Sequence, residues 1–300
     1  MKNRLFRMIA IVLTMITWTT IFHISALETV TGYNSQYLGV RSSIQIKVDG
    51  VITASDVAPE LLNDRTMVPL RVICENLGIK VDWLSSGAVL SKTDMKIVVK
   101  VNSRTVVSND AIILLDDEPY LKNNRIMVPL RFIAEAFGCD VNYENRIVTV
   151  DTEPLIIHGT PVKVLQNEFH MTMGGLVQQI EGNAYITSIY DMFIEKRGKS
   201  TTAPANYSWR GDMDTIGSYY KNAQFDFLDS HDKSIQRFEV YTLLGFNPSE
   251  TLSDYPKVLL YDATANLWYL VSDSAVQSLT LLIETVDKNG FLKIISNTIV

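Results

Sequence analysis

The sequence contains few of the residues from which metal sites and nucleophilic sites are usually built. Only two of its 300 residues are cysteines and four are histidines, and the histidines are scattered. It has no Cys-x-x-Cys pair and no Gly-x-Ser-x-Gly elbow, and Gly174-Gly175 is not followed by the Gly-Lys-Ser/Thr of a phosphate-binding loop. Zinc, nucleotide and serine-hydrolase chemistry therefore lack their sequence signatures. We expect no cofactor, and we favour a non-catalytic protein.

Positive charge is also scarce. The formal net charge is −6. Without the first 26 residues it becomes −9, because Lys2, Arg4 and Arg7 are lost and no acidic residue goes with them. An acidic surface without a basic stripe repels phosphate backbones. Nucleic acid is therefore not an expected partner.

Long apolar runs are missing beyond the N-terminus, where residues 1–26 resemble a secretory signal peptide. Three basic residues precede the apolar run 8–21, and Ser25-Ala26 offers a small-residue cleavage site. The run is shorter than the ~20 residues that a membrane-spanning helix needs. We expect a secreted or cell-envelope protein cleaved near Ala26, with membrane attachment only if the leader stays uncleaved.

The two cysteines, Cys74 and Cys139, lie within apolar patterns. An exported chain permits a disulfide between them, whereas a free cysteine in such a pattern behaves as a small buried hydrophobe. We favour two buried thiols over a bridge.

An internal repeat dominates the first half of the sequence. Residues 63–83 and 123–143 are identical at 11 of 21 positions, at a constant offset of sixty and without a gap. Upstream, the same offset relates Asp56 to Asp116 and Pro59 to Pro119. Such self-similarity indicates a duplicated structural unit.

Each copy predicts one short helix among β-strands. Leu70, Ile73 and Leu77 have helical spacing after Pro69, which suits a first helical turn, and Gly78 suits a left-handed cap. Alternating β-type runs flank this segment, and Asp49-Gly50 is a strong hairpin signal. Residues 40–152 are therefore predicted to form tandem α+β repeats of antiparallel strands plus a helix.

This pattern resembles a known family. The sequence Asn-x-Arg-x-Met-Val-Pro-Leu-Arg-x-Ile-x-Glu, present at 63–75 and 123–135, is similar to the copper amine oxidase N-terminal-like ("stalk") domain. The resemblance implies an exported scaffold or ligand-binding module that carries neither copper nor the quinone cofactor. The resemblance leaves the partner poorly defined, and from the predicted export we expect cell-wall polysaccharide or another envelope protein as the class of partner.

The family name calls for a test of oxidase chemistry. Asn142-Tyr143-Glu144 matches the short tripeptide around a quinone-forming tyrosine. Tyr143, however, occupies the repeat position of Trp83, which predicts an aromatic core plug in both copies. Copper needs convergent nitrogen ligands, and the scattered histidines do not predict them.

The repeated polar groups allow two interpretations. Arg65, Arg71, Arg125 and Arg131 are candidate ligand-binding residues, because arginine forks grip the carboxylates of an anionic or sugar ligand. The structural alternative is an ion pair within one helix, since Arg71 and Glu75 are four residues apart. We favour the ion pair.

The distal half, residues 163–300, reads as a β-rich domain of unknown function. Residues 153–162 resemble a linker with a turn at 158–161, and 176–180 with 184–195 suggest a helix and a strand pair. Short strands are predicted at 224–228, 238–244, 257–261, 268–271 and 291–295. Their spacing suggests a sandwich or barrel-like fold.

Candidate chemistry in this half is thin. Tyr207 and Trp209 are candidates for a stacking platform that binds sugars or peptides, with partial core burial as the favoured alternative. The carboxylates proposed for glycan hydrolysis are Asp191, Glu195, Asp212 and Asp214.

The predicted function is an exported cell-envelope scaffold or ligand-binding protein. Its stalk module presents a C-terminal binding domain, and no catalytic or metal-ligating residue is assigned. The alternative is an envelope hydrolase that acts on glycan or peptide, with its site in residues 163–300.

Overall fold

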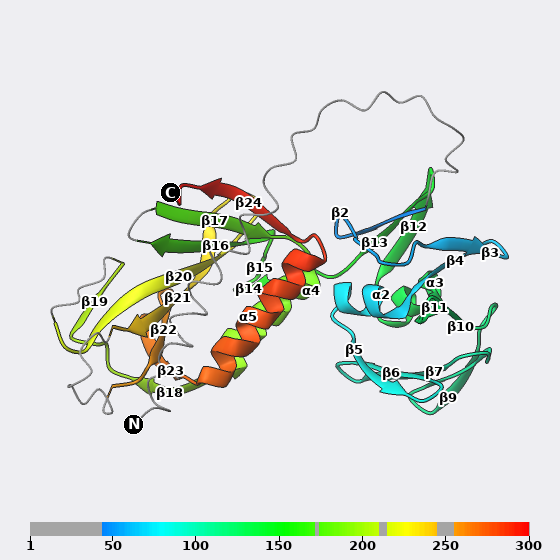
Figure 1. Ribbon diagram of the computed structural model, residues 1–300, viewed down its shortest axis with the longest axis horizontal. Coiled ribbons are helices and arrows are strands. Elements are labelled where there is room, and N and C mark those ends of the chain that lie inside the picture. Colours follow the sequence, from blue (N-terminus) through cyan, green and yellow to red (C-terminus); the bar gives the residue numbers. More distant parts are fainter. Residues whose placement is uncertain (1–43, 172–173, 210–214, 245–254, 300) are drawn as a thin grey trace, which may run out of the picture. The chain divides into compact units, whose positions relative to one another are not determined.

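The computed structural model describes residues 44–171, 174–209, 215–244 and 255–299 (Figure 1). The expected leader and two of the candidate carboxylates, Asp212 and Asp214, lie outside these ranges. Within the described ranges, every helix is too short or too polar to cross a lipid bilayer.

Residues 45–151 form three sheets. The first has the order β12-β13-β1-β2, the second β10-β11-β4-β3 and the third β5-β6-β7-β8-β9. The first sheet consists of β1 (Gln45–Val48), β2 (Val51–Ile52), β12 (Asp140–Glu144) and β13 (Ile147–Asp151). The second consists of β3 (Glu60–Leu62), β4 (Arg65–Pro69), β10 (Tyr120–Lys122) and β11 (Arg125–Pro129). The third consists of β5 (Lys80–Leu84), β6 (Gly87–Lys92), β7 (Met95–Lys100), β8 (Thr105–Ser108) and β9 (Ala111–Leu114).

Corresponding positions of the two sequence segments meet in the middle sheet. β4 and β11 pair antiparallel, so that Val68 lies opposite Val128 and Met67 opposite Pro129. The first sheet also joins the two segments, because β1 pairs in parallel with β13. The strands predicted for one unit therefore pair with strands of the other, and the two units do not form separate domains.

The predicted short helices are confirmed at α2 (Leu70–Asn76) and α3 (Leu130–Ala136). Leu70, Ile73 and Leu77 are buried, as the spacing predicts. Pro69 is the residue before the helix, one position earlier than predicted. Gly78 ends the segment at φ +67, and a Cβ there would lie 3.3 Å from the Cβ of Ala184, so glycine also permits close packing.

Residues 156–161 form a small hairpin of β14 (Ile156–Ile157) and β15 (Thr160–Pro161), around the predicted turn. The rest of the chain builds one nine-stranded sheet, with the path β18-β23-β22-β21-β20-β16-β17-β24 and β19 paired to β20. Its strands are β16 (Val164–Met171), β17 (Gly174–Ile180), β18 (Arg197–Thr201), β19 (Asn206–Ser208), β20 (Ser218–Leu228), β21 (Ser234–Leu243), β22 (Val258–Asp262), β23 (Leu267–Val271) and β24 (Leu292–Asn297).

Two helices pack on this sheet, α4 (Asn183–Glu195) and α5 (Asp273–Lys288), and they lie side by side (Figure 1). Phe193 of α4 contacts Phe225 and Phe238, with ring centroids 4.9 and 4.8 Å apart. The five strands predicted from sequence are confirmed in type. The predicted sandwich or barrel is wrong, because the domain has a single sheet with one face covered by helices. Residues 273–288 form a helix that the sequence analysis did not predict.

The β1–β2 turn contacts the start of α4. The Asp49 carboxylate accepts hydrogen bonds from the backbone N–H of Asn183 at 2.8 Å and of Thr152 at 2.8 Å. Nearby, Tyr185 donates to Asn76, and Asn289 donates to the Tyr185 hydroxyl. These contacts make residues 45–151 and the nine-stranded sheet parts of one continuous core.

Candidate functional site

Two open grooves contain the repeated arginines. Groove 1, of about 510 Å³, is lined by Arg71, Trp83, Leu84, Ser85, Ser86, Gly87, Val101, Asn102, Leu121, Asn124, Arg125 and Ile126. Groove 2, of about 280 Å³, is lined by Asp64, Arg65, Thr66, Leu114, Leu115, Asp116, Pro129, Leu130, Arg131, Phe132 and Glu135. Each groove thus has one arginine from a helix and one from a strand of the other sequence segment.

An arginine stacked on a tryptophan forms one wall of groove 1. The guanidinium of Arg71, on α2, lies over the Trp83 ring at 5.2 Å from its centroid. Trp83 is 46% exposed and Tyr143, its counterpart, is 45% exposed. The expected core plug is therefore wrong in both copies. The physical reason is that β5 and β12 are edge strands, where a neighbouring strand covers only one side.

Arg125 is held in place from the other side of groove 1. Its guanidinium forms an ion pair with Asp56, through Nε at 2.9 Å and through Nη2. The hydrogen bond from Arg125 lowers the pKa of the Asp56 carboxyl below its usual range. Asn124, the preceding residue, adopts φ +61 in the turn between β10 and β11. Arg125 is therefore oriented by a carboxylate that does not line the groove.

The arginines of groove 2 are both paired inside the groove. Arg65 forms an ion pair with Asp116 at 2.7 Å, which mirrors the pair between Arg125 and Asp56. Arg131 forms an ion pair with Glu135 at 3.7 Å, four residues along α3. The carboxylates of groove 2 thus offset its own cations.

The two linings therefore differ in charge. The described residues that line groove 1 include two arginines and no carboxylate, whereas groove 2 has two arginines and three carboxylates, Asp64, Asp116 and Glu135. Asn124 stands in groove 1 where groove 2 has Asp64. Because Asp56 pairs with Arg125 from outside the lining, Arg71 is the arginine of groove 1 that has no carboxylate partner among the described residues, and it makes the groove a local site for negative charge.

The favoured ion pair along the helix is found in one segment and not in the other. Arg131 and Glu135 form it. Arg71 instead stacks on Trp83, and Glu75 accepts a hydrogen bond from the Asn289 side chain at 3.3 Å. The expected Arg71–Glu75 pair is therefore wrong, because each side chain contacts a residue outside α2.

The aromatic candidates of the distal half lie at β19. Tyr207 is 44% exposed and its ring contacts those of Tyr241 and Trp268, with centroids 5.6 and 4.8 Å away. Trp209 is 51% exposed. Tyr207 is thus the exposed rim of an aromatic cluster whose members Tyr241 and Trp268 are buried.

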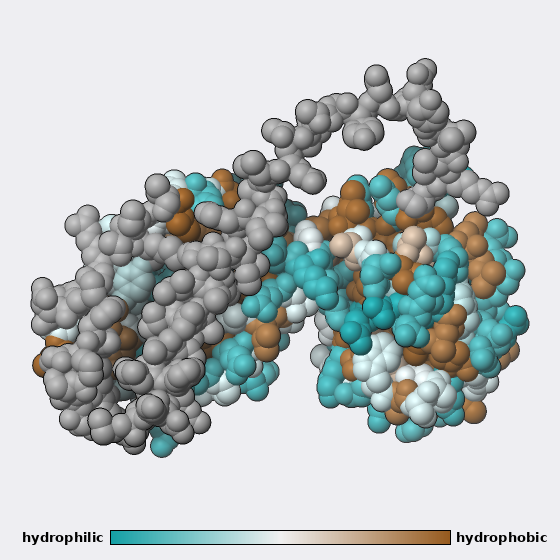
Figure 2. Space-filling view, viewed as in Figure 1, coloured by the Kyte–Doolittle hydropathy of each residue, from teal (hydrophilic) through white to brown (hydrophobic). Residues whose placement is uncertain are grey.

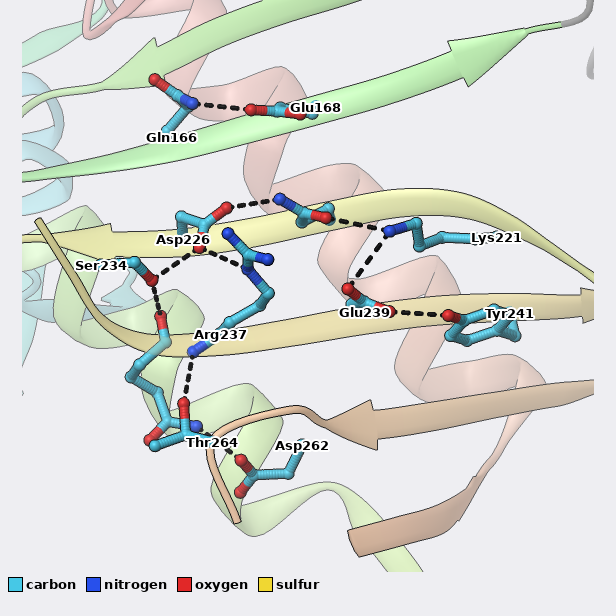
Figure 3. A network of polar contacts seen from close by, with 12 residues as sticks. Gln166, Glu168, Lys221, Asp226, Ser234, Arg237, Glu239, Tyr241, Asp262 and Thr264 are labelled. Carbon is cyan, nitrogen blue, oxygen red and sulfur yellow. Dashed lines mark hydrogen bonds and ion pairs between the residues drawn. The ribbon is translucent and has the colours of Figure 1, made fainter. Parts of the chain in front are cut away.

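A row of charged side chains around the buried carboxylates Asp226 and Glu239 on the nine-stranded sheet was missed by the sequence analysis (Figure 3). Asp226 accepts hydrogen bonds from Arg237 Nε at 2.7 Å and from Gln224 Nε2 at 2.6 Å. Glu239 accepts from Lys221 Nζ at 3.2 Å and from the Tyr241 hydroxyl at 2.6 Å. Because strand side chains alternate, this row lies on the face opposite Phe225 and Phe238. Its members satisfy one another, so it stabilises the sheet and leaves few groups for a ligand.

The carboxylates considered for hydrolysis are not assembled in the described part of the chain. Asp191 and Glu195 lie one turn apart on α4, and burial together with the charge of Glu195 raises the pKa of Asp191. Asp229 accepts hydrogen bonds from the backbone N–H groups of His231 and Lys233 in a turn. The described ranges contain no cluster of three or more His, Cys, Asp or Glu with metal-binding geometry.

The two cysteines are free and buried, which confirms the prediction of two thiols. Burial raises the pKa of both thiols, so neither is a reactive thiolate near neutral pH.

Comparison with known proteins places the first half of the chain. Residues 47–160 match the family described as copper amine oxidase N-terminal domain, which is a non-catalytic module. This match confirms the resemblance carried by the two Val-Pro-Leu-Arg sequences, and it does not extend into residues 161–300.

One curated relative adds to this picture. A protein called "Protease inhibitor" from Brevibacillus choshinensis is 29% identical over 139 residues, or 46% of this chain. The chain covers 42% of that relative's length. No solved structure matches the chain.

Proposed function

We propose that this chain is an exported cell-envelope binding protein that holds an acidic wall glycan in groove 1. In this proposal residues 40–152 are two copies of one module, and they also act as a scaffold for the sheet of residues 163–300. The observation that carries the proposal is the lining of groove 1, with two arginines and no carboxylate among its described residues.

The side chains of groove 1 suit a carboxylated sugar. The guanidinium group of Arg71 can donate paired hydrogen bonds to a carboxylate, whereas Arg125 already donates from Nε and Nη2 to Asp56. The exposed Trp83 ring offers an apolar surface for a sugar ring, and Asn102 and Asn124 offer amides for hydroxyl groups. A volume of about 510 Å³ is in the range of small-ligand sites and accommodates a short saccharide.

The comparisons support binding over catalysis. The matched family is a non-catalytic module, and the relative's printed name describes a protein that binds another protein. The expected leader supports delivery to the envelope, where acidic wall polymers are available.

The proposal is tested by calorimetric titration of the purified chain with soluble peptidoglycan fragments that carry free carboxylates. We expect binding to the acidic fragments, and loss of binding when their carboxylates are amidated. Arg71→Ala should weaken binding about tenfold or more, since a charge-assisted hydrogen bond is removed.

Arg131→Ala is the matched control, because it removes the corresponding arginine from groove 2 and should leave affinity unchanged. Equal binding of amidated fragments, or equal loss in both variants, would contradict the proposal. Cleavage of the fragments during the titration would favour the hydrolase alternative instead.

A further inference from the structure

The edge strand β9 exposes an unusual amount of apolar surface. β9 is the last strand of the five-stranded sheet, and all four of its residues, Ala111–Leu114, are exposed. Ile112 is 76% exposed and Leu114 is 73% exposed. Figure 2 shows hydrophobic residues among hydrophilic ones on the surface formed by residues 44–152. Exposed apolar edge strands pair readily with other chains unless charge or proline protects them.

The backbone of β9 has the geometry to receive another strand. Leu115 N–H donates to Arg104 C=O at 2.7 Å, and β9 pairs antiparallel with β8. Since hydrogen-bonded pairs alternate in such a ladder, Ile113 bonds to β8, whereas the N–H and C=O groups of Ile112 and Leu114 point away from it. Among the described residues, no strand lies on that side of β9.

An apolar stripe leads across the sheet to this edge. The register places Val89 beside Val98, Val98 beside Val107, and Val107 beside Ile112. These side chains share one face, and exposure rises along the stripe to 37% at Val107 and 76% at Ile112. A strand added to β9 would extend the stripe and cover its most exposed member.

The charges around β9 define the complementary partner. Asp110 precedes the strand, and the exposed Asp116 and Glu118 follow it. Leu114 also belongs to the lining of groove 2, which is net acidic. A partner with basic residues on either side of an apolar stretch is therefore favoured.

We propose that β9 accepts an extended segment of another protein as a sixth strand of this sheet. The segment carries apolar side chains that alternate along the strand and basic residues that flank them, one of which reaches the carboxylates of groove 2. A second copy of this chain is disfavoured, because antiparallel pairing of β9 with itself brings Asp110 of one copy toward Asp116 of the other. The binding mode is the addition of a strand to a sheet edge, which is independent of groove 1.

The test uses a synthetic peptide, Lys-Lys-Thr-Val-Thr-Ile-Thr-Val-Lys-Lys, and its counterpart with glutamates in place of the lysines. Amide hydrogen exchange of the full chain is followed by NMR with each peptide. We expect the lysine peptide to slow exchange at Ile112 and Leu114 about tenfold or more, with little change at Ile113, which already bonds to β8. The glutamate peptide should have no effect.

Ile112→Pro supplies the variant, because it removes an outward N–H that β8 does not use, and edge strands tolerate proline there. It should abolish binding of the lysine peptide. Arg71→Ala is the control and should bind normally, which separates this proposal from the one for groove 1.

Protection by both peptides equally, or by neither, would overturn the proposal. So would protection of Ile112 and Leu114 in the chain alone together with dimerisation, since the occupant would then be a second copy. These readings come from the unmodified chain and stand even if the proline variant fails to fold.

Discussion

Groove 1 and groove 2 share four corresponding lining positions, 71/131, 124/64, 125/65 and 126/66, yet groove 1 has no carboxylate among its described lining residues whereas groove 2 is net acidic. Arg71 corresponds to Arg131, and Arg125 corresponds to Arg65. In groove 2 both arginines have carboxylate partners within the lining, whereas in groove 1 Arg71 lies on an aromatic ring.

Beyond these shared positions the linings differ, because residues 83–87 and 101–102 line only groove 1 and residues 114–116 line only groove 2. Asn124 replaces the carboxylate that Asp64 contributes to groove 2, and the strand position of Trp83 carries Tyr143 in the other segment. Glu75, the counterpart of Glu135, contacts Asn289 in place of Arg71. The comparison teaches that both grooves receive one arginine from a helix and one from a strand, while the neighbours of each arginine decide whether it can serve a ligand.

The largest expected effect tests whether the two repeated segments, 63–83 and 123–143, pack into equivalent cores. Leu70→Ala and Leu130→Ala each truncate a side chain that is only 1% exposed. Each should lower the free energy of unfolding by about 2–5 kcal/mol, through lost burial and the cavity left behind. Urea denaturation measures both. If one variant were as stable as the parent, the packing equivalence of the halves would be refuted.

A second prediction concerns the β1–β2 turn, where Asp49 carries a charge that the position sixty residues later lacks. Burial raises the pKa of Asp49 above its usual range, although Thr152 and Asn183 donate hydrogen bonds to it. The residue at the sixty-residue offset from Asp49 is Asn109. The folded state therefore binds the Asp49 proton more tightly than the unfolded chain does. Protonation of Asp49 stabilises the fold at low pH, and this stabilisation is lost as pH rises through the folded-state pKa.

Asp49→Asn removes the titrating group and gives the residue found at the corresponding turn. The melting temperature of the parent relative to this variant should fall by a few degrees as pH rises from about 4, the usual pKa of an aspartate. The melting temperatures of both proteins are measured by circular dichroism from pH 3 to 8, in steps of about one pH unit. If the melting temperature of the parent rose relative to that of the variant with increasing pH, the direction of the Asp49 pKa shift would be contradicted.

The smallest effect is expected at the reciprocal ion pairs. Arg65→Gln and Arg125→Gln remove exposed pairs with Asp116 and Asp56. Each should lower the melting temperature by no more than about 2 °C at low salt, and by less at high salt, because exposed pairs are screened. Unequal losses in the two variants would show that the pairs are not equivalent.

Local patterns made much of the fold predictable. The spacing of Leu70, Ile73 and Leu77 predicts α2, and Asp49-Gly50 predicts the first hairpin, which has the left-handed φ values that such turns require. The distal strands were also found from alternation. The missed helix α5 does carry a capping signal, since the Ser272 hydroxyl accepts from Ala275 N–H, but its apolar positions are interrupted by polar residues.

Contacts between distant segments were not predictable. Asp56 and Arg125 are 69 residues apart and Glu75 and Asn289 are 214 apart, so no local spacing relates them. The exposure of Trp83 follows from the place of β5 at a sheet edge, which depends on strand order and not on the sequence of β5. The candidate arginines could therefore be named from the sequence, while the difference between the two grooves could not.

The most direct test of that difference is the NMR signal of the Trp83 indole N–H during titration with acidic peptidoglycan fragments. The signal is assigned with Trp83→Phe. The account predicts that it shifts on titration in the parent and in Arg131→Ala, and that it stays in place in Arg71→Ala. A shift that persists without Arg71, or one that disappears without Arg131, would contradict the assignment of binding to groove 1.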